Sequence, residues 1–422
     1  MFKSIIRTPF FKVASLNSVS VILKIGIGII TSKVLAVFVG PAGIALTGNL
    51  KNFLTSLENI ATLGFQNGIL KYVVEAKDDE NQLMRLLSTI FITLLAICVG
   101  LSVILFLFAG YWSSTLFGSS SSYSVVFKVL ALVLPWYASS VYLITVLNGL
   151  GNFKQVIYVN IIGNVFGLLF CLFAVSYFQT IGALFSIIIP PVFLFFVTLY
   201  YVAKKIPFFA MINRHSFDRK VLQNLSSYSL MALVSSVFGS LVFLAIRNKI
   251  IETLGINNAG YWEAMCRISS YYLMFISTIL TVYFYPKLAS TNSAKATQNV
   301  IKSYYLSVLP LFVLAIIILY FLRTYFVKLL FTNEFLPVVN LFFWQVVGDV
   351  FKVSSLILGY QFYARKLTLA FIISELFSLV IMYISVNFFI ISFGLDGVVM
   401  AHAVTYFFYF FALLFYFRKN IF

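Results

Sequence analysis

The stretch WQVVGDVFKVSSLILGY, Trp344 to Tyr360, places an acid and a base inside an apolar segment that runs from about residue 337 to 364. Asp349 and Lys352 lie three residues apart, so they share one face if the segment is a helix. A charge at the centre of a membrane helix costs roughly 2.5–3.5 kcal/mol on insertion scales. Such residues face a protein interior or a water-filled space, where they pair with one another or bind a charged ligand.

Other ionisable residues are embedded in apolar stretches in the same way. Glu263 and Arg267 are four residues apart and share a helix face, whereas Lys51 and Glu58 are seven apart on one face. Bases outnumber acids, which favours an anionic ligand, and the arginine fork suits phosphate oxygens. The embedded bases are Lys24, Lys33, Lys51, Lys128, Arg247, Lys249, Arg267 and Lys352, and the embedded acids are Glu58, Glu252, Glu263, Asp349 and Glu375.

Depth separates two groups of these charges. Residues near the outer ends of their stretches can reach the interface by snorkelling, so both a functional and an interfacial role stay open for them. These are Lys33, Lys128 and Lys249. The deeper residues must face an interior or a wet cavity. They are Lys24, Lys51, Glu58, Arg267, Asp349 and Lys352. For Asp349 and Lys352, a structural ion pair is the alternative interpretation.

The composition shows what kind of element must carry these side chains. The 422 residues are 62% hydrophobic and only 10% charged, whereas soluble domains average about 25% charged residues. The chain is therefore predicted to be an all-α integral membrane protein. Its net charge of +17 could indicate nucleic acid, but most lysines and arginines follow membrane topology instead. Nucleic acid is not an expected partner, and membrane lipids are.

Apolar runs separated by short polar turns predict twelve membrane-spanning helices. Their approximate limits are 14–39, 44–72, 84–112, 124–148, 155–178, 182–203, 224–251, 260–286, 300–322, 337–363, 367–391 and 396–417. Basic residues concentrate in every second connection, which by the positive-inside rule makes both termini cytoplasmic.

Three pairs of short stretches recur a little over two hundred residues apart. They are VGPAGIAL with NNAGYWEA, VLNGLGNFK with ILGYQFYARK, and FQTIGALF with SFGLDGVV. Weak repeats of this kind are typical of transporters whose substrate site lies between the halves. The sequence predicts two pseudo-repeated six-helix lobes, 1–203 and 224–422, joined by an amphipathic cytoplasmic linker, 204–223.

Several chemistries are disfavoured by what the sequence lacks. The chain has two histidines, His215 in the linker and His402 in the last apolar run, which argues against a histidine-based metal or redox site. No Walker-type phosphate loop occurs, and no outer connection is long enough to form a catalytic domain. We expect no catalytic residues, no metal and no cofactor.

Four stretches carry a family resemblance that spans both halves. They are LKIGIG (Leu23–Gly28), FVGPAGIAL (Phe38–Leu46), NGILKYV (Asn67–Val73) and WQVVGDVFKV (Trp344–Val353). With these motifs the chain resembles the Wzx-type flippases for O-antigen units and enterobacterial common antigen lipid III. These flippases belong to the polysaccharide transporter family of the multidrug/oligosaccharidyl-lipid/polysaccharide exporter superfamily.

The resemblance implies a bacterial inner-membrane flippase with the multidrug-exporter-like fold. Its substrate would be an undecaprenyl-diphosphate-linked oligosaccharide, moved from the cytoplasmic to the periplasmic leaflet by alternating access. A polysaccharide polymerase and a chain-length regulator are implied as partners.

In the related lipid II flippases, cations on the first, second and eighth helices meet the diphosphate. Lys24, Lys51 and Arg267 occupy comparable places. Two of these are lysines where that branch has arginines, and Ile25 stands where it has an acid. The two extra C-terminal helices of that branch are missing.

The hypothesis from residues and resemblance together is that Lys24, Lys51, Arg267 and Lys352 bind the diphosphate. Asp349 would orient Lys352 or take up a proton. The remaining embedded charges would line or gate the cavity: Lys33, Glu58, Lys128, Arg247, Lys249, Glu263 and Glu375. Two alternatives stay open, a cation-coupled multidrug exporter of the same fold and a membrane glycosyltransferase or O-antigen polymerase. The exporter predicts a net acidic site, and the polymerase predicts a large outer loop.

Overall fold

The chain folds into helices throughout the part that the computed structural model describes, namely residues 9–418 without 119–122, 214–215 and 292. Up to residue 211 the helices are α2 (Pro9–Phe38), α3 (Gly40–Ala61), α4 (Gln66–Ala76), α5 (Glu80–Leu107), α6 (Ala109–Phe117), α7 (Ser124–Gly149), α8 (Phe153–Ile188), α9 (Pro190–Ala203) and α10 (Phe208–Met211). After it they are α11 (Arg219–Leu233), the π-helix η2 (Val234–Phe238), α12 (Gly239–Leu254), α13 (Ile256–Ile279), the π-helix η3 (Leu280–Phe284), α14 (Tyr285–Ala289), α15 (Ala294–Phe321), α16 (Arg323–Leu330), the 3₁₀-helix η4 (Asn333–Phe335), α17 (Val338–Ala364) and α18 (Thr368–Tyr416).

Polar residues in the turns begin several of these helices. The Asp79 carboxylate accepts the backbone N–H groups of Asn81 and Gln82 at 3.0 and 3.1 Å, which caps α5. Ser293 caps α15 in the same manner through Ala296, at 3.2 Å. Such side chains satisfy N–H groups that the first helical turn cannot pair internally, so each fixes where an apolar run begins.

Nine stretches of the described residues are helical, long and apolar enough to cross a membrane. They are Val19–Phe38, Glu80–Leu107, Ser124–Gly149, Phe153–Ala203, Ser229–Leu254, Ile256–Ala289, Ala294–Phe321, Val338–Ala364 and Thr368–Tyr416. The chain is therefore a multi-pass membrane protein. Helix α3 is not among the nine, because Asn49, Lys51 and Glu58 make it too polar. This leaves the predicted number of twelve spans open.

Two of the nine stretches are far longer than one membrane crossing, and each is interrupted. Helix α8 breaks at Gln179 (φ 48°, ψ −123°) and α18 breaks at Gly394 (φ 58°, ψ −134°). Three residues after each break, a glycine packs directly against the backbone carbonyl group of the preceding helix. Gly182 meets Ala174, and Gly397 meets Phe389. Both stretches therefore turn back on themselves as tight helical hairpins.

The backbone breaks repeat along the chain. Positive φ angles occur at Gly40 and Gly255, at Gly151 and Lys366, and at Gln179 and Gly394, and the two members of each pair lie 215 residues apart. Five of these six positions lie within the stretches that repeat in sequence. The counterpart of Gly40 is Gly255, two residues before the stretch NNAGYWEA that the sequence comparison selected. The repeat in sequence is thus a repeat in backbone conformation.

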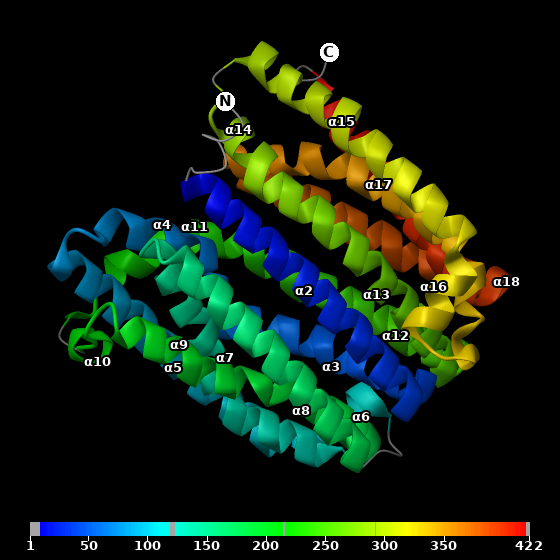
Figure 1. The fold of residues 1–422 in the computed structure, drawn as a ribbon, viewed down its shortest axis with the longest axis horizontal. Coiled ribbons are helices and arrows are strands. Elements are labelled where there is room, and N and C mark those ends of the chain that lie inside the picture. The colour runs from blue at the N-terminus through cyan, green and yellow to red at the C-terminus, as the bar shows by residue number, and fades with distance from the viewer. Residues whose placement is uncertain (1–8, 119–122, 214–215, 292, 419–422) are drawn as a thin grey trace. The chain divides into compact units, whose positions relative to one another are not determined.

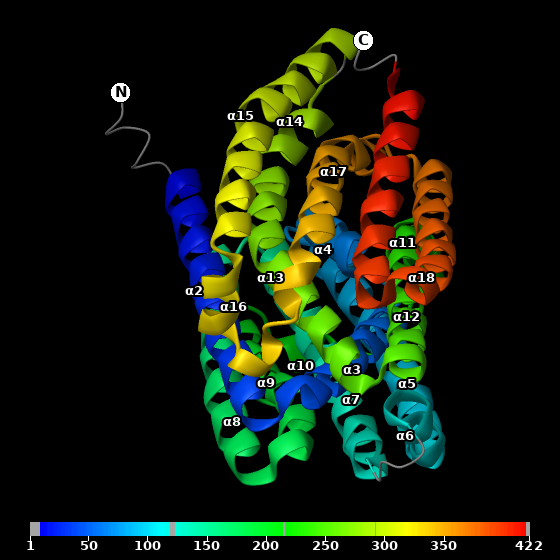
Figure 2. The ribbon, with the colours of Figure 1, turned by 90° about the vertical axis from the view of Figure 1, so that its right-hand side faces the viewer.

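The described chain forms two compact units. Unit 1 holds Met1–Val34 and Asn49–Leu241, and unit 2 holds Leu35–Gly48 and Val242–Phe422. In unit 1, α7 packs against α5, α8 and α9 (Figure 1). In unit 2, α17 packs against α13, α15 and α18 (Figures 1 and 2). Helices α7 and α17 are the most deeply buried of the long helices and hold equivalent places in the repeat.

Part of the predicted linker, 204–223, is hydrogen-bonded to α5 of unit 1. The Ser88 hydroxyl of α5 donates to the Met211 carbonyl oxygen at 2.7 Å, and the Asp218 N–H donates to the Thr89 hydroxyl at 2.9 Å. His215 lies outside the described residues. Hydrogen bonds therefore hold this part of the linker against α5.

Candidate functional site

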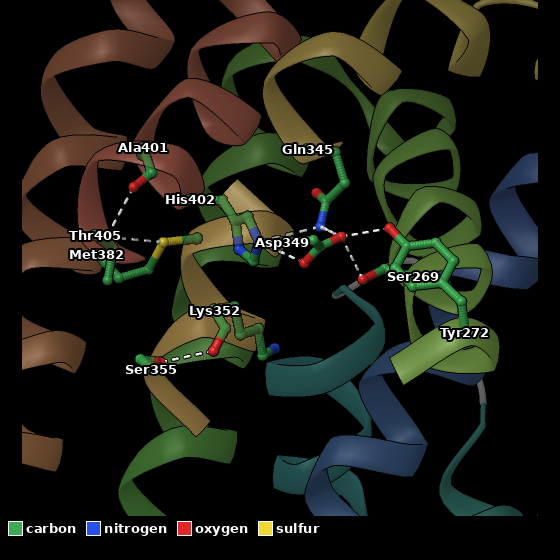
Figure 3. A network of polar contacts seen from close by, with 10 residues as sticks. All are labelled: Ser269, Tyr272, Gln345, Asp349, Lys352, Ser355, Met382, Ala401, His402 and Thr405. Carbon is green, nitrogen blue, oxygen red and sulfur yellow. Dashed lines mark hydrogen bonds and ion pairs between the residues drawn. The ribbon is translucent and has the colours of Figure 1, made fainter. Parts of the chain in front are cut away.

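Asp349 is the centre of a polar cluster inside unit 2 (Figure 3). Its side chain is fully buried. One carboxylate oxygen contacts the Nε2 atom of His402 at 3.0 Å. The other accepts hydrogen bonds from the hydroxyls of Ser269 (2.7 Å) and Tyr272, and from the Gln345 amide at 3.1 Å. Three helices, α13, α17 and α18, thus supply donors to one acid, so the carboxylate is satisfied without leaving the apolar span.

Close packing of α17 on α18 makes this cluster geometrically feasible. A methyl group on Gly348 would approach the backbone Cα and N atoms of Ala403 to 3.0 and 3.1 Å and would collide with the His402 ring. The Gln345 amide nitrogen lies 3.2 Å from the same Nε2 atom of His402. The absence of a side chain at residue 348 therefore lets the two helices approach closely enough for these contacts.

Lys352 does not form the ion pair with Asp349 that the sequence spacing predicts. Among the described residues, its ammonium group has no carboxylate within ion-pair distance. It lies instead 4.8 Å from the ring centroid of Tyr406 on α18, while it remains within the electrostatic field of Asp349. The structural-pair interpretation is wrong because the four donors occupy the carboxylate. A ring face attracts Lys352 but does not neutralise its charge.

A second charged cluster in unit 2 joins Arg247 of α12 with Glu263 and Arg267 of α13. The i,i+4 contact predicted from spacing is present, with Arg267 Nε 3.1 Å from Glu263 Oε1. Arg247, only 1% exposed, reaches the other oxygen of Glu263 at 2.5 Å. Two guanidinium groups thus share one carboxylate, so the cluster keeps a net positive charge.

The junction of α2 and α3, which belongs to unit 2, completes this cluster. The Arg267 guanidinium donates to the Thr47 hydroxyl at 2.9 Å. A methyl group on Gly48 would lie 2.6 Å from a Glu263 oxygen and 2.9 Å from the Arg247 guanidinium carbon. The other face of Arg247 lies over the Trp262 ring, 5.2 Å from its centroid. Gly48 therefore leaves the space that the Arg247–Glu263 pair fills.

In unit 1 the clearest charged contact is Glu58 of α3. It accepts hydrogen bonds from the Tyr137 hydroxyl of α7 and from the Gln66 amide at 3.3 Å. Lys24 of α2 and Lys51 of α3 are exposed. The four predicted phosphate ligands thus divide by unit, with Lys24 and Lys51 in unit 1 and the other two in unit 2.

The remaining predicted site residues lie at other places in the units. Lys128 in unit 1 is exposed and lies 5.9 Å from the centroid of the Phe106 ring. The others, all partly exposed, are Lys33 in unit 1 and Lys249 and Glu375 in unit 2.

His402, Tyr137 and Tyr272 contact the buried acids, and the sequence pattern predicts none of these contacts. His402 had been noted only as one of two histidines, which argued against metal. An ionisable residue inside a long apolar run indicates a functional or buried polar site. That feature pointed to Asp349 and applies equally to His402. Within the described residues no group of three or more histidine, cysteine, aspartate or glutamate side chains is arranged to hold a metal ion.

The described chain thus consists of two units of long helices with repeated backbone breaks and buried charges. The described chain superposes on an inward-facing multidrug MATE transporter of the MOP superfamily with a TM-score of 0.76, at 14% identity and 94% coverage of each chain. It superposes on the lipid II flippase MurJ in an inward closed conformation with a TM-score of 0.74. That match has 16% identity and covers 97% of this chain and 87% of MurJ.

The chain belongs to the family described as "Polysaccharide biosynthesis protein", whose pattern it matches over residues 11–292. It is 29% identical over 395 residues to the lipid III flippases of Escherichia coli strain K12 and Shigella flexneri. Each match covers 93% of this chain and 94% of the relative. The family resemblance carried by the four sequence motifs is confirmed.

Replacing Gly48 with alanine is expected to destabilise unit 2. The added methyl group must push Glu263 away from Arg247, and overpacking of this kind costs roughly 1–3 kcal/mol. The Tm of the purified variant in detergent measures the effect. Gly100→Ala in α5 is the matched control, because nothing lies within 4 Å of a methyl group there. Equal Tm values for the two variants would contradict this account of Gly48.

The proton on His402 can be located because the chain has only one other histidine. In the His215→Gln variant, ¹⁵N labelling of histidine leaves a single imidazole for NMR. We expect a protonated Nε2, since this atom faces a carboxylate oxygen of Asp349 at 3.0 Å. Asp349→Asn should change this signal, and Asp396→Asn on the same helix α18 should not. An unprotonated Nε2 in the otherwise unaltered site would refute the assignment.

Proposed function

We propose that this protein is a flippase for an undecaprenyl-diphosphate-linked oligosaccharide, such as an O-antigen unit or enterobacterial common antigen lipid III. The observation that carries the proposal is that two arginines of unit 2 share one acid, while Lys352 forms no ion pair with Asp349. Arg247 and Arg267 share the single carboxylate of Glu263, and Lys352 lies against a ring face. The lipid III flippases that match the chain along nearly its whole length support the same substrate class.

The buried cations explain why an anionic head group suits this chain. A charge inside an apolar span is stabilised by a counter-charge, and these residues have fewer carboxylates than cations within reach. A diphosphate would supply the missing negative charge. Arg267 uses its Nε atom on Glu263 and one terminal nitrogen on Thr47, which leaves the other terminal nitrogen for a phosphate oxygen. Lys352 is the second proposed phosphate ligand of unit 2, and Lys24 and Lys51 are the proposed phosphate ligands of unit 1.

The proposed topology has twelve spans with both termini in the cytoplasm of a bacterial inner membrane. The hairpins of α8–α9 and α18 count as two crossings each, and the polar helix α3 counts as one more. A helix with buried charges crosses a membrane when its polar face lines protein or water rather than lipid. The clustering of basic residues in alternate connections supports this orientation. The lobes would be 1–203 and 224–422, with the linker between them.

Transport would proceed by alternating access, with the lipid tail remaining in the bilayer. Moving a negative charge outward across an inside-negative potential is downhill by roughly 2.3 kcal/mol per charge per 100 mV. The membrane potential alone can therefore favour the cytoplasmic-to-periplasmic direction. Proton uptake at Asp349 would add a second driving force. A polysaccharide polymerase and a chain-length regulator are the proposed partners that receive the translocated unit.

A cation-coupled multidrug exporter is the alternative that the fold favours, given the likeness to MATE transporters. Sites for cationic drugs should be net acidic. In unit 2 the acid Asp349 is already occupied by neutral donors and His402, and Glu263 is shared by two arginines. No spare carboxylate among these residues would attract a cation, so the flippase is the better proposal.

Single alanine substitutions of Lys24, Lys51, Arg267 and Lys352 test the proposed diphosphate site. Truncating one member of a desolvated charged contact costs about 2–5 kcal/mol, so we expect flipping to fall by about tenfold or more. Surface polysaccharide in a flippase-null strain, normalised to the amount of protein in the membrane, is the measurement.

Charge-keeping and surface substitutions control this experiment. Lys24→Arg and Lys51→Arg retain the cation and should retain activity. Lys295→Ala removes an exposed cation at the start of α15 and should have no effect. Normal complementation by all four alanine variants at equal abundance would rule out the diphosphate site.

A further inference from the structure

Unit 2 contains a continuous group of tyrosines that begins beside Lys352. We name Tyr285, Tyr360, Tyr363, Tyr406 and Tyr409 the tyrosine wall. Tyr406 lies against Lys352, and the ring centroids of Tyr406 and Tyr409 are 6.3 Å apart. The Tyr409 hydroxyl comes within 4.0 Å of where a methyl group on Gly359 would lie, so it reaches α17.

The wall continues along α17 toward its end. The ring centroids of Tyr360 and Tyr363 are 6.2 Å apart, and Tyr285 lies 5.8 Å from Tyr360. From Lys352 to Tyr363 the helix advances eleven residues, which is about 16 Å at the α-helical rise. The wall is therefore an extended strip with a cation at one end and aromatic rings along its length.

Polar groups accompany the rings of the tyrosine wall. The hydroxyls of Thr281 and Tyr360 are hydrogen-bonded at 3.0 Å on the exposed side of the helices. The Glu375 carboxylate interacts electrostatically with Tyr363 and Tyr409. Tyr363 is 38% exposed, and Tyr285, Tyr360 and Tyr406 are partly exposed. The strip thus offers partly exposed ring faces together with hydroxyl groups.

Neighbouring tyrosines in the same unit show what a purely structural tyrosine does. The Tyr304 hydroxyl donates to the Val353 carbonyl oxygen at 2.9 Å, and Tyr305 donates to the Ser354 carbonyl oxygen at 2.7 Å. Both hydroxyls tie α15 to the backbone of α17. The hydroxyls of Tyr360 and Tyr409 contact side chains instead, Thr281 and Ser374. The hydroxyls of Tyr360 and Tyr409 therefore do not bind the backbone of a neighbouring helix in this way.

We propose that the tyrosine wall binds the glycan of the lipid-linked substrate, with the first sugars near Lys352 and the following ones toward Tyr363. A sugar ring has apolar C–H faces and hydroxyl edges. An aromatic ring with a polar group covers the former and hydrogen-bonds to the latter. This inference rests on the proposed function, since it takes the diphosphate to lie at Lys352.

Binding of two lipids to the purified full-length chain tests the proposal. The probes are undecaprenyl diphosphate without sugar and the same lipid carrying one N-acetylglucosamine, with affinity measured by microscale thermophoresis in detergent. We expect Tyr360→Ala and Tyr363→Ala to weaken binding of the sugar-bearing lipid by about tenfold, as the loss of a ring contact predicts. Binding of the bare lipid should stay unchanged, because neither side chain contacts Lys352.

Three further variants separate the explanations. Tyr360→Phe keeps the ring and should lose less affinity than Tyr360→Ala. Tyr305→Phe removes a partly buried hydroxyl outside the tyrosine wall and should bind both lipids as the parent chain does. Lys352→Ala should weaken both lipids together, because it removes the charge that both head groups share.

The outcomes distinguish failure of the inference from failure of the proposed function. If the parent chain binds neither lipid, the flippase function itself is wrong. If it binds both, and the alanine variants of Tyr360 and Tyr363 keep the parent affinities, the tyrosine wall does not bind glycan. An equal loss for both lipids at an unchanged Tm would also overturn the inference, since the tyrosines would then act on the shared head group.

Discussion

The cost of placing charge in an apolar environment governs the internal structure of unit 2. Asp349 is tolerable there only because donors from α13, α17 and α18 surround both of its oxygens. The same contacts fix the register of these three helices, since a slip of one residue on any of them would leave a buried carboxylate unsatisfied. Gly348 permits the close helix approach on which the His402 contact depends. A polar group that is costly to bury thus specifies how the apolar helices pack.

The two halves of the internal repeat share backbone turn conformations but differ in the side chains that pair their buried acids. Helices α3 and α13 hold equivalent places, as do α7 and α17. A contact between a phenol and a carboxylate joins α3 to α7, and another joins α13 to α17. In unit 1 the acid is Glu58 on α3 and the phenol is Tyr137 on α7. In unit 2 the acid is Asp349 on α17 and the phenol is Tyr272 on α13. The turn conformations repeat at a fixed interval because they define the fold. The acid and the phenol, in contrast, have exchanged helices between the two contacts, which gives the two units different charge distributions.

The features that depend on local sequence were predictable. Apolar runs indicated the helices, small turn residues indicated the repeat, and the four-residue spacing indicated the contact between Glu263 and Arg267. Contacts between distant segments were not, because His402 is 53 residues from Asp349 and Tyr137 is 79 residues from Glu58. No periodicity carries information over such separations. The spacing of Asp349 and Lys352 put both on one helix, but spacing alone could not reveal that donors from other helices occupy the acid.

The missing ion pair between Asp349 and Lys352 affects the charge that Lys352 presents to a ligand. Had it been matched with Asp349, the two charges would have cancelled and the site would have had little attraction for an anion. Neutral hydroxyls, an amide and His402 contact the acid, and Lys352 lies beside the Tyr406 ring instead of forming an ion pair with Asp349. Arg267 is in a similar position, since it shares Glu263 with Arg247. In the proposed flippase function, both cations would gain more from an incoming diphosphate than an already paired cation would.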